Sequence, residues 1–254
     1  MTIHLITAEN QNLYADLMTE HFRVRHDIYV RERGWKALAR SDGLERDQFD
    51  DADTVYVLAE DQGRIVGGSR LRPSLKPHLL GEVFPHLAEG LGVPRGPDIY
   101  EWTRLFILKD RREGWKHGAL PGQIVCGGLE YLLDEGVTAF SLILEMWWIP
   151  RFHEMGWKIT PLGIPDLIEN EWWVAAKVAV NAQMLESTRH FCDLPGRPIL
   201  TRRGLRSRSP GARLKERGRR NGQHQQALLA ADRRSPHGRS AGLGRVSSLR
   251  APRA

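Results

Sequence analysis

The segment TVYVLAEDQGRIVGGSRLRP, residues 54–73, decides the fold of this chain. Residues 54–60 and 64–71 are runs of mainly apolar and β-branched side chains, and the turn-forming triplet Asp-Gln-Gly at 61–63 separates them. Two such runs joined by a short glycine-containing turn predict a β-hairpin. We therefore expect at least one antiparallel pair in the sheet.

Helical and extended patterns alternate around this hairpin. Apolar residues at helical spacing predict a helix over 10–25, and the polar residues 31–53 predict a long loop, which in compact domains tends to be functional. This order favours an α/β protein with a mixed, twisted sheet covered by helices. The further expected elements are a short helix after Pro77, a strand over 98–108, a helix over 121–135, a strand over 138–144, a short helix over 150–155, and strands over 157–162 and 174–184.

Charge divides the chain into two segments. Of the 254 residues, 41% are hydrophobic, which is enough for a folded core. Residues 201–254 hold 15 Lys and Arg against two acidic residues, a net charge of +13, which leaves −7 for residues 1–200. Because the tail also lacks aromatic residues, we expect one folded domain over 1–200 and a disordered or weakly helical Arg-rich tail over 201–254.

Cysteine content and hydropathy exclude several classes of protein. Cys126 and Cys192 form no disulfide framework and lack nearby metal-ligating partners in the sequence, so we expect no structural metal. The N-terminal residues resemble no secretory signal, and no apolar run reaches the roughly 18 residues that a membrane span needs. A cytoplasmic protein without a membrane partner is expected.

Candidate catalytic residues occur in YEWTRLFIL, residues 100–108. Strand alternation places Glu101 and Thr103 on one face and Arg104 on the other. Glu101 and Arg104 can share one site only if the strand bulges between them, and bulges occur often beside active sites. The alternative is an ordinary ion pair on an exposed strand.

Two arginines share one face of the hairpin. Arg70 and Arg72 lie in GGSRLRP, residues 67–73, two positions apart on the same strand. Adjacent guanidinium groups repel unless anions lie between them. The loop ERDQFDD, residues 45–51, offers such anions in Glu45, Asp47, Asp50 and Asp51, with Asp47 or Asp50 expected beside the arginines, and an anionic substrate is the alternative.

These motifs, together with FRVRHDIYVRERGW at residues 22–35, occur in an order that resembles the acyl-homoserine-lactone synthases, the autoinducer synthase family of bacterial quorum sensing. The resemblance covers about residues 1–190. It implies an α/β/α sandwich like that of the GNAT acetyltransferases. It also implies acyl transfer from a thioester to the amine of S-adenosylmethionine, followed by lactone closure that releases methylthioadenosine. S-adenosylmethionine would be a co-substrate, with no tightly bound cofactor.

The resemblance also assigns roles to individual residues. A cationic sulfonium substrate suits aromatic faces and carboxylates, and its own carboxylate suits a guanidinium group. Its protonated amine needs a base, for which Glu101 is the candidate. The expected catalytic residues are Glu101, Arg104, Asp47 and Arg70. The expected S-adenosylmethionine contacts are Arg25, Tyr29, Arg31, Trp35, Asp47, Asp50, Arg104 and Phe106.

The resemblance also implies that the segment FSLILEMWWIPRF, residues 140–152, lines the acyl pocket and chooses the acyl group. Its bulky side chains without hydroxyl groups favour a short pocket for a branched or aromatic acyl chain, although core packing is the alternative for several of them. The expected pocket residues are Thr103, Leu142, Leu144, Met146, Trp147 and Trp148. Family members that use acyl carrier protein generally have several basic residues after this strand, whereas this chain has only Arg151 and Lys158 there. The WWIPR text resembles the branch of the family that uses CoA thioesters of aryl or branched acids, so acyl-CoA is favoured over acyl carrier protein. The basic, Gly-containing residues 110–118 would contact the CoA pyrophosphate at a helix N-terminus.

Two other functions remain open. One is an N-acyltransferase of the same fold that acts on another amine. The other is binding of nucleic acid or another anionic surface through the Arg-rich tail, which is otherwise a dispensable extension.

Overall fold

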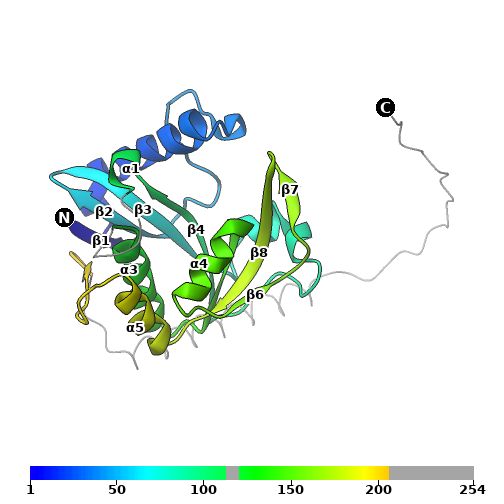
Figure 1. Cartoon of the computed structure of the whole chain (residues 1–254). Coiled ribbons are helices and arrows are strands. Elements are labelled where there is room, and N and C mark those ends of the chain that lie inside the picture. Colours follow the sequence, from blue (N-terminus) through cyan, green and yellow to red (C-terminus); the bar gives the residue numbers. More distant parts are fainter. Residues whose placement is uncertain (113–119, 206–254) are drawn as a thin grey trace, which may run out of the picture. The chain divides into compact units, whose positions relative to one another are not determined.

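The computed structural model describes residues 1–112 and 120–205, which form one α/β unit (Figure 1). Nine strands form one mixed sheet in the order β6-β8-β5-β4-β3-β2-β1-β9, with β7 paired to β8. The strands are β1 (Thr2–Ile6), β2 (Val55–Asp61), β3 (Arg64–Pro73), β4 (Ile99–Ile107), β5 (Ala139–Glu145), β6 (Ile159–Pro161), β7 (Asp166–Ile168), β8 (Glu171–Ala179) and β9 (Leu200–Thr201). The α-helices are α1 (Ala15–His26), α2 (Leu79–Glu82), α3 (Leu120–Asp134), α4 (Ile149–Glu154) and α5 (Ala182–Phe191).

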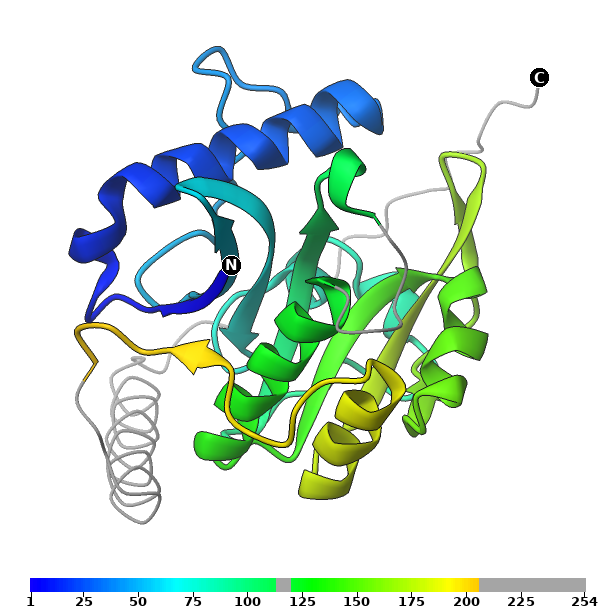
Figure 2. The same cartoon turned by 60° about the vertical axis from the view of Figure 1, so that its left-hand side comes forward.

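Helices cover both faces of the sheet (Figures 1 and 2). Strand β2 explains why, because its side chains alternate between two apolar clusters. Val57 belongs to the cluster that includes α3, whereas Tyr56 and Leu58 belong to the cluster that includes Met18 and Phe22 of α1. The predicted α/β/α sandwich with a mixed sheet is therefore confirmed.

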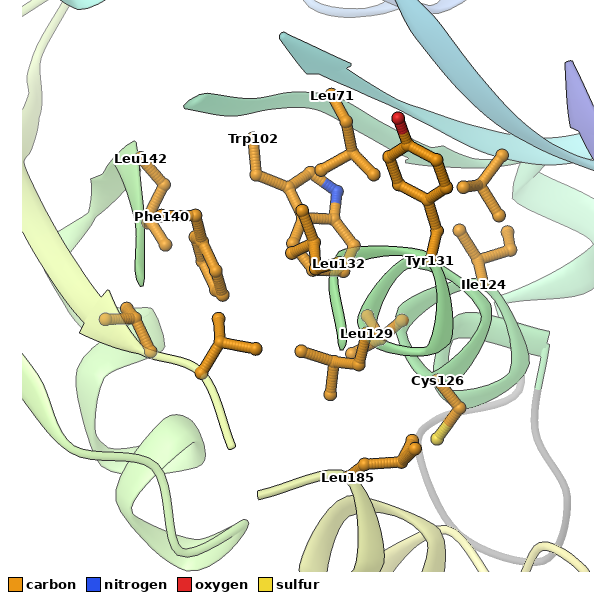
Figure 3. Close-up of a cluster of buried hydrophobic side chains, with 14 of the residues drawn as sticks. Leu71, Trp102, Ile124, Cys126, Leu129, Tyr131, Leu132, Phe140, Leu142 and Leu185 are labelled. Carbon is orange, nitrogen blue, oxygen red and sulfur yellow. The ribbon is translucent and has the colours of Figure 1, made fainter. Parts of the chain in front are cut away.

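Helix α3 packs closely against the sheet in the larger cluster (Figure 3). A Cβ atom on Gly128 would lie 2.4 Å from the indole of Trp102, so only glycine allows this approach. The indole of Trp102 lies in turn against the ring of Phe140 on β5, with 5.0 Å between ring centroids. This packing fixes the position of β4 relative to β5.

The sheet opens between these two strands. They are parallel, and only three residue pairs are in register, the last of which is Glu101 with Ser141. Strand β4 continues to Ile107 and β5 to Glu145 beyond this point. The two strands thus separate at Glu101, beside the predicted site.

The hairpin of residues 54–71 is confirmed as β2 and β3, and most later elements lie where they were expected. The prediction of a strand over residues 174–184 was wrong in its second half, because β8 ends at Ala179 and α5 begins at Ala182. The side chain of Asn181 caps α5 by accepting a hydrogen bond from the N–H of Met184 at 2.9 Å.

Three short strands were not predicted. They are β1, β7 and β9, and β9 pairs in parallel with β1. The carbonyl of Arg203 also accepts a hydrogen bond of 2.8 Å from the Asn10 amide. The packed part of the described chain therefore extends beyond residue 200. Residues 206–254 of the expected tail lie outside the described residues.

Candidate active site

A β-bulge in β4 brings the predicted catalytic residues onto one face of the sheet. Gly68 is in register with Phe106, and Arg70 with Thr103, so one residue of β3 lies opposite two residues of β4. Arg104 has a φ of 54°, a left-handed conformation that is uncommon for a residue with a side chain. Because of this bulge, Thr103 and Arg104 both lie on the face of the sheet that carries Arg70. The strand therefore has, at Arg104, the distortion that a site shared by Glu101 and Arg104 requires.

Three arginines and three carboxylates form a buried network at the bulge. Arg25 on α1 donates to both oxygens of Asp50, at 2.8 and 3.0 Å, and it also pairs with Glu45. Arg104 donates to Glu45 at 2.9 Å and to Asp47 at 3.1 Å. The network has equal numbers of positive and negative groups, which offsets the cost of burying each charge.

Arg70 completes the network from β3. Its Nη1 donates to Asp47 at 2.6 Å and lies 3.2 Å from an oxygen of Asp50, and its Nε donates to the hydroxyl of Thr103 at 3.0 Å. Neighbouring Arg72 instead pairs with both oxygens of Asp51, at 2.6 and 2.8 Å. The sequence left two sources of negative charge open for these arginines. In the structure the acidic loop supplies it, through Asp47 and Asp51.

The network fixes the charge of its members. Burial alone would raise the pKa of the Asp50 carboxyl, but Arg25 and Arg70 hold that pKa well below its usual range. Burial would also raise the pKa of Glu45, yet Arg25 and Arg104 lower it. His21 is fully buried next to Arg25, and burial, followed by the charge of Arg25, lowers its pKa well below the ordinary value. The carboxylates of Glu45 and Asp50 are thus ionised and the imidazole of His21 neutral at pH 7.

Solvent reaches this network at one acidic residue. The side chains of Glu45 and Asp50 are each 1% exposed, whereas that of Asp47 is 13% exposed. Arg104 is 7% exposed and pairs directly with Asp47. A bound substrate would therefore meet Asp47 and Arg104 first, and the remaining groups hold this pair in position.

Glu101 lies on the same face, and its carboxylate already has two donors. Its oxygens accept hydrogen bonds from the backbone N–H groups of Leu79 and Leu80, at 3.0 and 2.6 Å, and the residue is 1% exposed. Glu101 thus lies where β4 and β5 separate, and its carboxylate anchors the first residues of α2.

Aromatic rings border the network on the α1 side. Tyr29 and Trp35 stack with 5.2 Å between ring centroids and 13° between ring planes. The guanidinium group of Arg104 lies over the Tyr29 ring, and that of Arg33 lies over the Trp35 ring, each at 5.3 Å. The predicted aromatic contacts and the predicted charges therefore lie next to one another.

Two other predicted contacts of S-adenosylmethionine, Phe106 and Arg31, do not face the network in the same way. Phe106 is buried in the apolar cluster beneath the network. Arg31 is 73% exposed and pairs with Asp27, so the structure does not bring it to the network.

The residues expected to form the acyl pocket divide into three groups. Thr103 faces the charged network, where its hydroxyl accepts a hydrogen bond from Arg70. Leu142 and Leu144 are buried in the cluster shared with α3, and Trp148 packs against that cluster. Met146 and Trp147 are 40% and 60% exposed. Trp148 stacks on Trp147 with 4.4 Å between ring centroids. The expected contacts of residues 110–118 with a pyrophosphate fall mainly on residues 113–119, which lie outside the described residues.

Sequence reasoning missed Arg33 and Glu145, which form an ion pair of 2.8 Å at the edge of this site. Glu45 was noted only as part of the acidic loop, although it accepts from two arginines of the network. The charged residues of RERGW, residues 31–35, mark Arg33 as a candidate site residue. No sequence pattern, however, pairs Arg33 with a residue 112 positions away.

Cys126 and Cys192 are buried free thiols, and burial raises the pKa of each, to about 12 and about 11. Among the described residues, no group of His, Cys, Asp and Glu side chains has an arrangement that could hold a metal ion. No helix in that part of the chain has both the length and the apolar character of a membrane span.

The separating strands and the charged network beside them define an α/β protein of the acyltransferase type. The model of the family described as "Autoinducer synthase" matches residues 9–187. The isovaleryl-homoserine lactone synthase of Bradyrhizobium diazoefficiens is 49% identical over 193 residues, which cover 76% of this chain and 86% of that protein. The chain belongs to the autoinducer synthase family.

Solved structures agree with this assignment. The CoA-dependent acyl-homoserine lactone synthase BjaI, solved with SAM and isopentyl-CoA, has a TM-score of 0.76 and 45% identity, and the match covers 84% of this chain and 98% of BjaI. TofI, solved in a ternary complex with an inhibitor and MTA, has a TM-score of 0.63 and 28% identity over 77% of this chain and 98% of TofI.

Proposed function

We propose that this chain is a CoA-dependent acyl-homoserine-lactone synthase that transfers a short, branched acyl group to the amine of S-adenosylmethionine. The observation that carries this proposal is the likeness to BjaI over nearly the whole of that protein, because BjaI was solved with SAM and isopentyl-CoA. The relative that is 49% identical is named for an isovaleryl product. The isovaleryl group, like the isopentyl group, is a branched chain of five carbons.

In this proposal the network binds the amino-acid end of S-adenosylmethionine. Asp47 receives the α-amino group and Arg104 the carboxylate, because these two are the accessible members of the network. Arg25, Asp50 and Arg70 position that pair. The rings of Tyr29 and Trp35 border the sulfonium through cation–π attraction.

The acyl thioester lies where β4 and β5 separate. The amine loses a proton and attacks the thioester carbon, so that a C–N bond forms and the C–S bond to CoA breaks. Glu101, next to the point of separation, takes the proton through a water molecule, because its own oxygens are held by Leu79 and Leu80. Backbone N–H groups of the bulged β4 stabilise the oxyanion. The substrate carboxylate then closes the lactone, and methylthioadenosine leaves.

Leu144 and Trp148 would limit the length of the acyl chain. Both side chains lie along or next to the end of β5 on the α3 side, and neither carries a hydroxyl group. A branched chain fills such a short apolar wall better than a long straight one. The test of the proposed function is to supply purified protein with S-adenosylmethionine and isovaleryl, hexanoyl or octanoyl groups, each as a CoA thioester and as a carrier-protein thioester. We expect the isovaleryl-CoA reaction to be fastest, and preference for carrier protein would contradict the proposed donor.

The Arg-rich tail is proposed to have no part in this reaction, which would take place in the cytoplasm, where both substrates occur. A truncation that tests this should end after Leu205, because Thr201 pairs with β1 and Arg203 bonds to Asn10. Unchanged turnover supports the proposal. If truncation lowers turnover, and if added nucleic acid changes the turnover of the full chain, the tail has a function of its own.

A further inference from the structure

A short segment of the chain spans the two strands that separate. Residues 33–35, which we call the strap, follow the π-helical turn Asp27–Glu32 at the end of α1. At one end, the ring of Tyr29 in that turn stacks on Trp35, and the Tyr29 hydroxyl donates to the carbonyl of Leu105 on β4 at 3.4 Å. The strap is thereby attached to the β4 side of the site.

The other end of the strap contacts β5 and β8. Arg33 donates to the Oε1 atom of Glu145, the last residue of β5, at 2.8 Å. Glu145 is in register with Trp173 of β8, and the ring of Trp173 lies 6.0 Å from that of Trp35. Arg33 and Trp35 thus contact Glu145 and Trp173, which are paired residues of β5 and β8.

Glu145 also holds a residue of the proposed acyl pocket. Its Oε2 atom accepts a hydrogen bond from the indole N–H of Trp148 at 3.1 Å, while Oε1 is held by Arg33. The Glu145 side chain is 11% exposed, so its charge is largely removed from water and depends on these donors. Each carboxylate oxygen therefore connects a different part of the site.

We propose that Arg33 and Glu145 are positioning residues that form a clasp between the two substrate subsites, and that the clasp sets acyl-chain selectivity by fixing the indole of Trp148. The inference rests on the proposed function, because it assigns the strap to the S-adenosylmethionine side and Trp148 to the acyl side. Loss of Arg33 would free Glu145 to reorient, and loss of Glu145 would free both Arg33 and Trp148.

The physical consequence is coupling between the subsites. With the clasp closed, the indole of Trp148 donates a hydrogen bond to Glu145 and stacks on Trp147 and Phe152, and it limits chain length. With the clasp open, the indole loses the hydrogen bond that fixes its orientation between these two rings, and longer straight chains enter. Trp35 loses the guanidinium group over its ring and becomes less ordered as a wall for the sulfonium.

The experiment uses the full chain and the variants Arg33→Ala, Glu145→Ala and the double variant. Arg95→Ala is the matched control, because Arg95 has the same 39% side-chain exposure as Arg33 and pairs with Glu82 at 3.2 Å, away from the strap. Selectivity is measured as the ratio of kcat/KM for isovaleryl-CoA to that for octanoyl-CoA. It is measured again as the ratio of dissociation constants of the corresponding non-reactive thioether analogues.

We expect each clasp variant to lower both ratios by roughly tenfold, as for the loss of one charged hydrogen bond, and the double variant to lower them no further. Arg95→Ala should leave both ratios unchanged. If the clasp variants lose kcat equally for both thioesters and neither ratio changes, the clasp is only a structural contact and the inference is wrong.

The two proposals can fail separately. Wild-type protein that binds both analogues selectively but makes no lactone would refute the proposed function, and the binding ratios would still decide the clasp. Wild-type protein that binds neither analogue would refute both proposals.

Discussion

Replacement of Asp50 by Asn should destabilise the chain strongly, because it removes one negative charge from a buried network. Asp50 accepts two hydrogen bonds from Arg25, one from the Tyr56 hydroxyl at 2.9 Å and one from the N–H of Asp47 at 3.0 Å. The amide of Asn would place N–H donors against the donors of Arg25. Breaking a buried ion pair from one side costs about 3–5 kcal/mol, a large part of the stability of a domain.

Urea unfolding measures this loss. For an m-value of about 2 kcal/mol per molar urea, the transition midpoint of Asp50→Asn should fall by roughly 2 M. The control is Asp42→Asn, which removes an exposed partner of Arg46 at 3.0 Å and should leave the midpoint unchanged. Equal midpoints for the two variants would refute the view that buried charges hold the network together.

Three further predictions follow from the packing and charge of the site. Arg104→Ala should lower kcat by at least ~100-fold while circular dichroism shows a folded chain, and near-wild-type turnover would remove Arg104 from the site. Because burial keeps the folded pKa of His21 below its unfolded value, stability should fall as pH drops below about 6.5, by up to about 1.4 kcal/mol per unit, and His21→Phe should reduce this slope in unfolding experiments. Gly128→Ala should cost about 1–3 kcal/mol of unfolding free energy by overpacking against Trp102, whereas Gly196→Ala, with open space around its Cβ, should not; equal effects would contradict the packing argument.

Local patterns explain which elements could be predicted. The hairpin was readable because both strands and their turn lie within twenty residues and carry their own signals. The boundary between β8 and α5 was missed because apolar residues continue across it without Gly or Pro, although Asn181 is a recognisable cap. Strand β9 has two residues, too few for any periodicity, and it exists only through its pairing with β1.

The site was predictable in its residue types but not in its pairing. A requirement for anions beside Arg70 and for a bulge before Arg104 follows from charge repulsion and strand alternation, and the structure has both. Sequence could not tell that Asp47 is the accessible acid, since this depends on the burial of Asp50 by elements far apart in the chain. The same reason hid the contact of Arg33 with Glu145.

The central claim is that acyl transfer and lactone closure occur on one substrate, S-adenosylmethionine. Its most direct test is the stoichiometry of the reaction of purified protein with isovaleryl-CoA and S-adenosylmethionine, followed by mass spectrometry. We predict equal amounts of free CoA, methylthioadenosine and isovaleryl-homoserine lactone. Release of CoA without methylthioadenosine would contradict the claim and indicate an N-acyltransferase that acts on another amine.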